Sequence, residues 1–227
     1  MNIFSDSRLD TQCAYCGSFP ESRDHVPSKI LLDKPYPDNL PVVVSCMACN
    51  NGFSLDEEYF ACVIECAFHG TSDIEKLTRE SIKKTLRYNQ KLHKRISSAF
   101  NQDDQGLNIE IERFENVLSK CGFGHLKFEN SETEFNKPDN IWFKPLHSMT
   151  EKEVKNFFSV SEVEKAPEVG SRSMQRLILN KQGKPIENWI IVQEGVYSYL
   201  VSISMGLKKV RILIRSYLAC EISWTSN

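Results

Sequence analysis

The sequence predicts an α+β protein with a short N-terminal module rich in cysteine and proline, then a long helix, then an antiparallel β-rich region. Three observations lead to this fold class. Cysteines occur in two close pairs before residue 50, apolar residues recur at helical spacing over residues 72–101, and β-branched and aromatic runs separated by glycine turns fill residues 188–224.

Length and composition are typical of a globular protein. The 227 residues are 41% hydrophobic and 26% charged, and this length suits one large domain or a small module joined to a larger one. The net charge of −2 gives the whole molecule no attraction for a polyanion. A role with nucleic acid would therefore need a local basic patch.

No apolar run reaches the ~20 residues that span a bilayer, and the N-terminus has no basic start followed by an apolar stretch. We therefore expect a cytoplasmic protein with no membrane partner. Eight cysteines in such a chain indicate metal binding or burial rather than disulfides.

Four cysteines form two matched pairs, Cys13-x2-Cys16 and Cys46-x2-Cys49. Two such turns supply the tetrahedral four-thiolate shell that Zn(II) prefers. A closed shell has no open position for a substrate, so we expect a structural zinc that holds together a segment too polar to build its own core. The remaining cysteines lie in apolar surroundings and are expected to pack in the core: Cys62, Cys66, Cys121 and Cys220.

A helix is predicted over residues 54–69. Ser54 and Glu57 have the spacing of a capping box, apolar residues follow at helical intervals, and Gly70 provides a stop. We place a domain boundary here, with a module over residues 1–70 and a second region over residues 71–227.

A long helix is predicted over residues 72–101, with Ser72 as its N-cap. Its basic side chains recur at helical spacing, which would give sequence-independent affinity for a phosphate backbone, although a solvated helix face explains them equally well. Lys83 and Arg87 represent this face as candidate nucleic-acid contacts. The full set is Lys76, Arg79, Lys83, Lys84, Arg87, Lys91, Lys94 and Arg95.

The rest of the chain is expected to alternate short elements. After a loop at 101–106, we predict a strand over 107–114, a short helix over 115–129, a helix over 150–158, a linker near 164–173 and the antiparallel meander. Residues 208–215 read as a half-buried strand. No role is assigned to this region.

The segment between the cysteine pairs carries the remaining chemistry. The order Cys-x2-Cys, Asp24-His25-Val-Pro, Asn39-Leu, Cys-x2-Cys-Asn50 resembles the HNH nucleases with a ββα-metal fold and a zinc-stapled loop. The resemblance covers about residues 13–60.

The resemblance implies a role for each matching residue. His25 would be the general base on water, Asp24 a ligand of the catalytic cation, and Asn39 the brace of the loop that helps to hold the histidine. Asn50 would be the second protein ligand of the cation, with Asn51 as the alternative.

These roles also make physical sense. A carboxylate and an amide oxygen form a hard oxygen-only pair that suits Mg(II) or Mn(II), with Ni(II) as a further choice. A neutral imidazole can take a proton from water near neutral pH. Arg23 and Lys29 flank the Asp-His pair and are candidate phosphate contacts.

The first hypothesis is thus a metal-dependent HNH endonuclease, a hydrolase of phosphodiester bonds in nucleic acid, with DNA favoured over RNA. The second is a non-catalytic zinc module that binds nucleic acid or a partner protein. The third is the nuclease subunit of a larger bacterial defence complex. A homodimer is compatible with each.

Overall fold

The computed structural model describes residues 10–100, 108–163, 167, 169–179, 181–204 and 206–225. They form a mixture of helices and strands, which confirms the α+β class at this level. The chain divides into two compact units, one made of Met1–Gly52 with Leu118–Asn227 and the other of Phe53–Val117. The expected boundary after residue 70 does not coincide with this division, because the helix at 54–69 belongs to the second unit.

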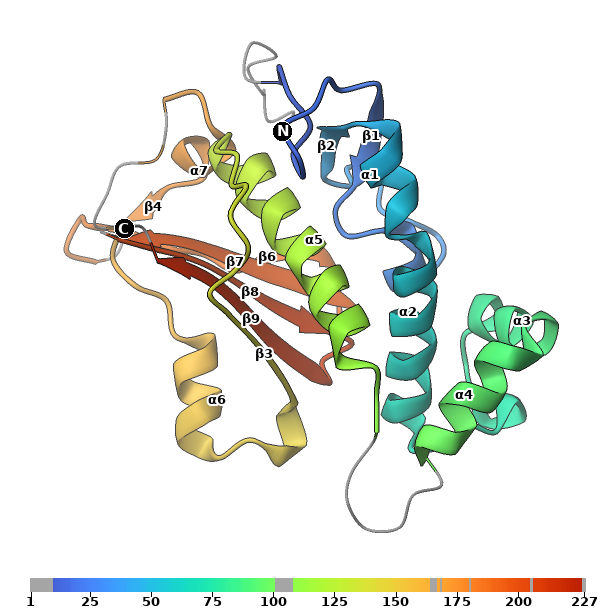
Figure 1. The fold of residues 1–227 in the computed structure, drawn as a ribbon. Helices are drawn as coiled ribbons and strands as arrows, with labels where there is room; N and C mark the ends of the chain where they lie inside the picture. Colours follow the sequence, from blue (N-terminus) through green and yellow to red (C-terminus); the bar gives the residue numbers. More distant parts are fainter. Residues whose placement is uncertain are drawn as a thin grey trace. The chain divides into compact units, whose positions relative to one another are not determined.

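The first unit begins with a small antiparallel hairpin and a short helix (Figure 1). The elements are β1 (Ser22–His25), η2 (Lys29–Leu31), β2 (Val42–Ser45) and α1 (Met47–Gly52). In the hairpin Asp24 lies opposite Val43, and His25 lies opposite Val42. Because successive side chains of a strand point to opposite faces, Asp24 is buried while Arg23 is exposed.

The larger part of the first unit is a five-stranded antiparallel sheet in the order β3-β9-β8-β7-β6. Its strands are β3 (Asn140–Pro145), β6 (Ile190–Gln193), β7 (Tyr197–Ser204), β8 (Leu207–Ile214) and β9 (Leu218–Thr225), and a separate pair is formed by β4 (Ile178–Leu179) and β5 (Pro185–Ile186). The predicted meander and the half-buried strand within it are confirmed, since Val210, Ile212 and Ile214 are buried on one face. Strand β3 was not predicted. It depends on pairing with β9, a distant partner that local pattern does not reveal.

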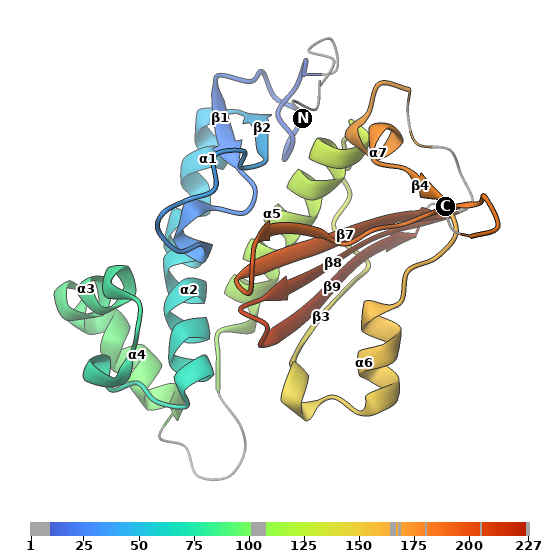
Figure 2. The ribbon, with the colours of Figure 1, turned by 180° about the vertical axis from the view of Figure 1, so that it is seen from behind.

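Helix α5 (Ile111–Asn130) crosses one face of this sheet (Figures 1 and 2). A Cβ at Gly122 would lie 2.7 Å from the Trp224 ring, so the glycine permits the close approach. His125 stacks on Tyr199 with ring centroids 3.7 Å apart. On the opposite face of the sheet, the Arg211 guanidinium donates to the carbonyl oxygen of Phe157 in α6 (Glu151–Phe158).

The helix predicted over 115–129 is confirmed as part of α5, which is longer and has 20 residues. The strand predicted over 107–114 is wrong, because α5 already begins at Ile111. The short pattern of apolar and polar residues in Ile-Glu-Arg-Phe fits the period of a strand or that of a helix. In the structure Phe114 is buried at helical spacing from the buried Val117 and Leu118. Leu107 lies outside the described residues.

Shorter helices follow α5 in the first unit. These are η4 (Leu146–Ser148), α6 (Glu151–Phe158) and α7 (Arg172–Gln175). The helix predicted over 150–158 is confirmed, and Thr150 and Glu153 form its capping box. The linker predicted near 164–173 contains the start of α7, and residues 164–166 and 168 of it lie outside the described part of the chain.

The second unit is helical, with α2 (Ser54–His69), η3 (Ile74–Lys76), α3 (Glu80–Tyr88), α4 (Gln90–Phe100) and the first turns of α5. The range of α2 and its stop are confirmed, because Gly70 adopts a left-handed φ of 63°. The capping box at Ser54 is wrong. The N-cap is Phe53, which makes no side-chain cap bond.

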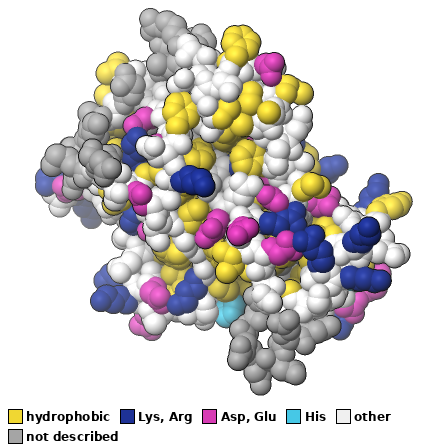
Figure 3. All heavy atoms as spheres, in the orientation of Figure 1, with side chains coloured by type: hydrophobic (Ala, Val, Ile, Leu, Met, Phe, Trp, Pro, Cys, Tyr) yellow, Lys and Arg dark blue, Asp and Glu magenta, His cyan; other side chains and the backbone are white. Residues whose placement is uncertain are grey.

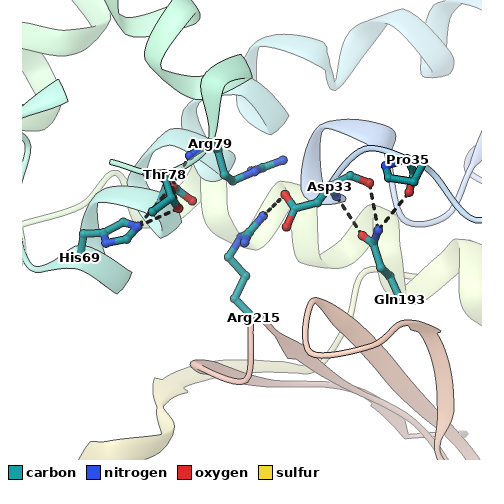
Figure 4. A network of polar contacts seen from close by, with 8 residues as sticks. Asp33, Pro35, His69, Thr78, Arg79, Gln193 and Arg215 are labelled. Carbon is teal, nitrogen blue, oxygen red and sulfur yellow. Dashed lines mark hydrogen bonds and ion pairs between the residues drawn. The ribbon is translucent and has the colours of Figure 1, made fainter. Parts of the chain in front are cut away.

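The long helix predicted over 72–101 is also wrong, since η3, α3 and α4 replace it. Ser72 is not its N-cap; Asp73 caps η3 by accepting a hydrogen bond from the backbone amide of Glu75. The buried Glu65 carboxylate accepts hydrogen bonds from the amides of Thr78 at 3.1 Å and Arg79 at 2.9 Å, at the start of α3 (Figure 4). This remote cap fixes a helix start that local sequence does not announce. The loop predicted at 101–106 lies outside the described residues.

Among the residues described, no helix combines the length and the apolar character needed to cross a membrane.

Candidate functional site

The four predicted cysteine ligands converge in the first unit. The Sγ atoms of Cys13, Cys16, Cys46 and Cys49 all lie within 4.8 Å of one another, and those of Cys16 and Cys46 are 3.7 Å apart. Thiolates around a tetrahedral zinc are separated by about 3.8 Å. Backbone amides of Tyr15 and Cys49 donate to Cys13 Sγ and Cys46 Sγ, each at 3.4 Å. The cluster therefore fits a metal such as zinc.

Local backbone geometry brings the two cysteine pairs together. Gly17 follows the first pair with a left-handed φ of 75°, which a residue with a side chain rarely adopts. The amide of Cys13 donates to the carbonyl of Ser18 at 2.8 Å and closes this turn, while the amide of Ala14 donates to Val44 of β2 at 3.0 Å. The first pair is thereby fixed over the hairpin that leads into the second.

The thiols do not share one environment. Hydrogen bonds with Ser18 lower the pKa of Cys16 to about 6. Burial raises the pKa of Cys13 and of Cys49 above the usual 9.0. A cation held by the cluster would stabilise all four as thiolates, because a coordinating thiol is deprotonated.

Asp24 is buried and already paired. The Tyr15 hydroxyl donates to its Oδ2 at 3.0 Å, and Lys120 Nζ lies 2.8 Å from the same oxygen. The side chains of Lys120 and Asp24 are only 3% and 9% exposed. Asp24 is thus the anionic half of a buried ion pair.

His25 is half-buried and projects from the opposite face of the hairpin to Asp24. Burial lowers its pKa below the usual 6.5, and the positive charge of Lys29 acts in the same direction, while Asp24 opposes them. No hydrogen bond joins the imidazole to another residue in the described part of the chain. At neutral pH the ring is neutral and able to accept a proton.

Asn50 lies on α1 against β1. Its Nδ2 donates to Ser22 Oγ at 3.1 Å and to the carbonyl oxygen of Arg23 at 3.3 Å. Since Ser22 and Asp24 share a face of β1, Asn50 and Asp24 lie on the same side of the strand. Asn51, the alternative ligand, is exposed.

Asn39 is exposed in the turn before β2, and no hydrogen bond joins it to another described residue. The loop is instead tied to the sheet by Asp33 (Figure 4). Gln193 Oε1 accepts from the Asp33 amide at 2.8 Å, Gln193 Nε2 donates to the Asp33 carbonyl at 2.9 Å, and Arg215 reaches the Asp33 carboxylate at 2.5 Å. The bracing role expected of Asn39 stays a prediction.

A cavity of 810 Å³ adjoins the hairpin. Arg23 and Asn39 line it together with Val42, with Arg172 of α7 and with Arg176, which directly follows α7. Arg176 is paired with Glu129 at 2.5 Å, so part of its positive charge is neutralised.

Among the other candidate nucleic-acid contacts, Lys29 belongs to the first unit, and Lys83 and Arg87 belong to the second. Lys29 is exposed, with its ammonium 5.7 Å from the centre of the Tyr36 ring. Lys83 pairs with Glu80 at 3.0 Å, and Arg87 pairs with Glu75 at 2.9 Å. On the face drawn in Figure 3, basic and acidic side chains are interspersed. The predicted backbone-binding role of Lys83 and Arg87 therefore remains a prediction.

Sequence reasoning missed two residues that touch Asp24. Lys120 lies in a stretch whose neighbours Val117, Leu118 and Cys121 are buried, and a lysine inside an apolar stripe is a usable signal of a buried partner. Tyr15 stands between the two cysteines of the first pair. Nothing in the spacing indicated that its hydroxyl reaches the Asp-His segment.

The chain matches no family model, no curated protein and no solved structure.

Proposed function

We propose that the chain is a metal-dependent HNH-type endonuclease that hydrolyses phosphodiester bonds in nucleic acid, with DNA favoured over RNA. The observation that carries the proposal is the hairpin β1–β2 followed by α1, with Asp24 and His25 ending β1 and Asn50 lying against it. The four-cysteine cluster holds the ends of this unit together, and we assign it a structural zinc.

His25 is the general base in this proposal. Its neutral imidazole takes a proton from the attacking water, which makes the water a better nucleophile. The Arg23 side chain projects from the same face of β1 as His25 and lines the adjoining cavity. Its guanidinium is therefore suited to hold a phosphate oxygen.

Asp24 and Asn50 supply the oxygen donors for a divalent cation, Mg(II) or Mn(II), with Ni(II) as a further choice. A carboxylate and an amide oxygen on one side of β1 fit such a hard cation chemically. When bound, the cation would neutralise charge that grows on the phosphate. Asp24 and His25 project to opposite faces of β1. A phosphate that contacts both the cation at Asp24 and the water at His25 must therefore lie along the edge of β1, where Asn50 Nδ2 donates to the carbonyl oxygen of Arg23.

A plasmid-nicking assay tests the proposal. Purified wild-type protein is expected to nick supercoiled DNA with Mg(II), Mn(II) or Ni(II), and His25→Ala is expected to lose this activity. His147→Ala is the matched control, because His147 is an exposed histidine outside the hairpin. Full cation-dependent nicking by His25→Ala would reject the mechanism.

One observation favours a second candidate, a non-catalytic zinc module that binds nucleic acid or a partner protein. The carboxylate expected to hold a cation is already neutralised by Lys120. This candidate predicts a protein that binds zinc but does not nick DNA in the presence of any divalent cation. The same assay therefore separates the two candidates.

A further inference from the structure

Lys120 is a buried cation placed directly on the proposed cation ligand. Its Nζ lies 2.8 Å from Asp24 Oδ2, with 3% of its side chain exposed. The ammonium therefore occupies the side of the carboxylate from which solvent is largely excluded.

The packing of α5 fixes this arrangement. Gly124 lies one helical turn after Lys120, and a Cβ there would come within 2.5 Å of a methyl carbon of Val26, which follows His25. The glycine lets the helix approach the end of β1 closely. Lys120 is on the same helical face, so it meets Asp24 because the backbone of α5 is held against the hairpin.

The two oxygens of Asp24 have different surroundings. Tyr15 and Lys120 both contact Oδ2. Within the described residues, no hydrogen bond reaches Oδ1. A divalent cation that used Oδ1 would lie a few ångströms from the ammonium, where like charges repel strongly because the site is partly desolvated.

We propose that Lys120 is a positioning residue that competes with the divalent cation for Asp24 and so weakens cation binding by the free protein. The inference rests on the proposed function, since it takes Asp24 as a cation ligand. Lys120 makes the fold of the site independent of the cation, because it supplies a counter-charge for the carboxylate from within the chain. The cost is a lower affinity for the catalytic metal.

The test is Mn(II) affinity, measured on the full-length zinc-loaded protein from the electron paramagnetic resonance signal of free Mn(II). Lys120→Met keeps most of the length of the side chain and removes its charge. We expect it to bind Mn(II) at least about tenfold more tightly than wild type. We also expect a larger rise in Tm on adding Mn(II), because the cation replaces the missing counter-charge.

Lys127→Met is the matched control. Lys127 is a buried lysine of the same helix that donates to Ser131 rather than to Asp24, so its loss should leave Mn(II) affinity at the wild-type value. Lys120→Gln is a second variant, because its neutral amide can still donate to the carboxylate if the methionine variant does not fold. Equal or weaker Mn(II) binding by the folded Lys120 variants, or no Mn(II) binding by any of the proteins, would overturn the inference.

The result is separable from that of the nicking assay. If the Lys120 variants bind Mn(II) more tightly but neither they nor wild type nicks DNA, the competition stands and the nuclease proposal fails. If wild type nicks DNA and Lys120→Gln binds Mn(II) no more tightly, the competition fails and the nuclease proposal stands.

Discussion

The four-cysteine cluster and the Asp24 carboxylate lie close together along the chain but differ in how their charge is balanced. Contacts to the cysteine Sγ atoms come from backbone amides, from Ser18 and from the other thiols. Asp24 instead has an ammonium from α5 at 2.8 Å. In the proposed function the cluster takes a metal from outside the chain to balance its thiolates, whereas Asp24 is balanced by Lys120 within the chain.

Removing metal should therefore affect the two sites unequally. Chelation of zinc, or Cys49→Ala, is expected to unfold the N-terminal module, because structural zinc contributes on the order of 10 kcal/mol in small zinc modules. The measurement is zinc content together with amide NMR spectra. Cys62→Ala is the control, since this buried thiol lies outside the cluster and its loss should leave zinc content unchanged. Retention of the native spectrum without zinc would show that the cysteine cluster, like Asp24, does not depend on a metal.

Breaking the Asp24–Lys120 pair should cost less than losing zinc. Asp24→Ala leaves the buried ammonium without this partner, and we expect a loss of about 3–5 kcal/mol in the free energy of unfolding. Urea unfolding followed by circular dichroism measures it. The double variant Asp24→Ala with Lys120→Met should recover part of the loss, because it removes both charges. A fully stable Asp24→Ala protein would show that the pair does not hold the hairpin.

The smallest effect concerns His125, a buried residue of α5 that stacks on Tyr199 of the sheet. Full burial lowers its pKa to about 3. Between that value and about 6.5 the unfolded chain binds a proton that the folded protein does not, so stability is complete above pH 6.5 and falls as the pH falls. The expected slope is up to about 1.4 kcal/mol per pH unit.

Urea midpoints measured between pH 4 and pH 7 test this slope. His125→Phe keeps an aromatic ring against Tyr199 and should flatten the pH dependence, although it leaves the Tyr197 hydroxyl without its 2.8 Å contact. His147→Ala should keep the wild-type slope. An unchanged slope in His125→Phe would assign the acid sensitivity to other groups.

Local signals predicted much of the fold. The cysteine pairs, the range of α2 with its stop at Gly70, and the helix over 150–158 each depend on residues within a few positions of one another. The meander was also predictable, because its strands are neighbours along the chain. The strand β3 and the start of α3 were not, since each depends on a partner distant in sequence, β9 for the former and Glu65 for the latter.

The sequence by itself determined that four thiols meet, because two short turns and one hairpin place them. It also marked His25, Asp24 and Asn50 as the residues of interest. Only the tertiary structure decided how Asp24 is balanced, because Lys120 reaches it through the packing of Gly124 on Val26, a contact between segments that no local spacing connects. The burial that strengthens this pair is likewise a property of the folded chain.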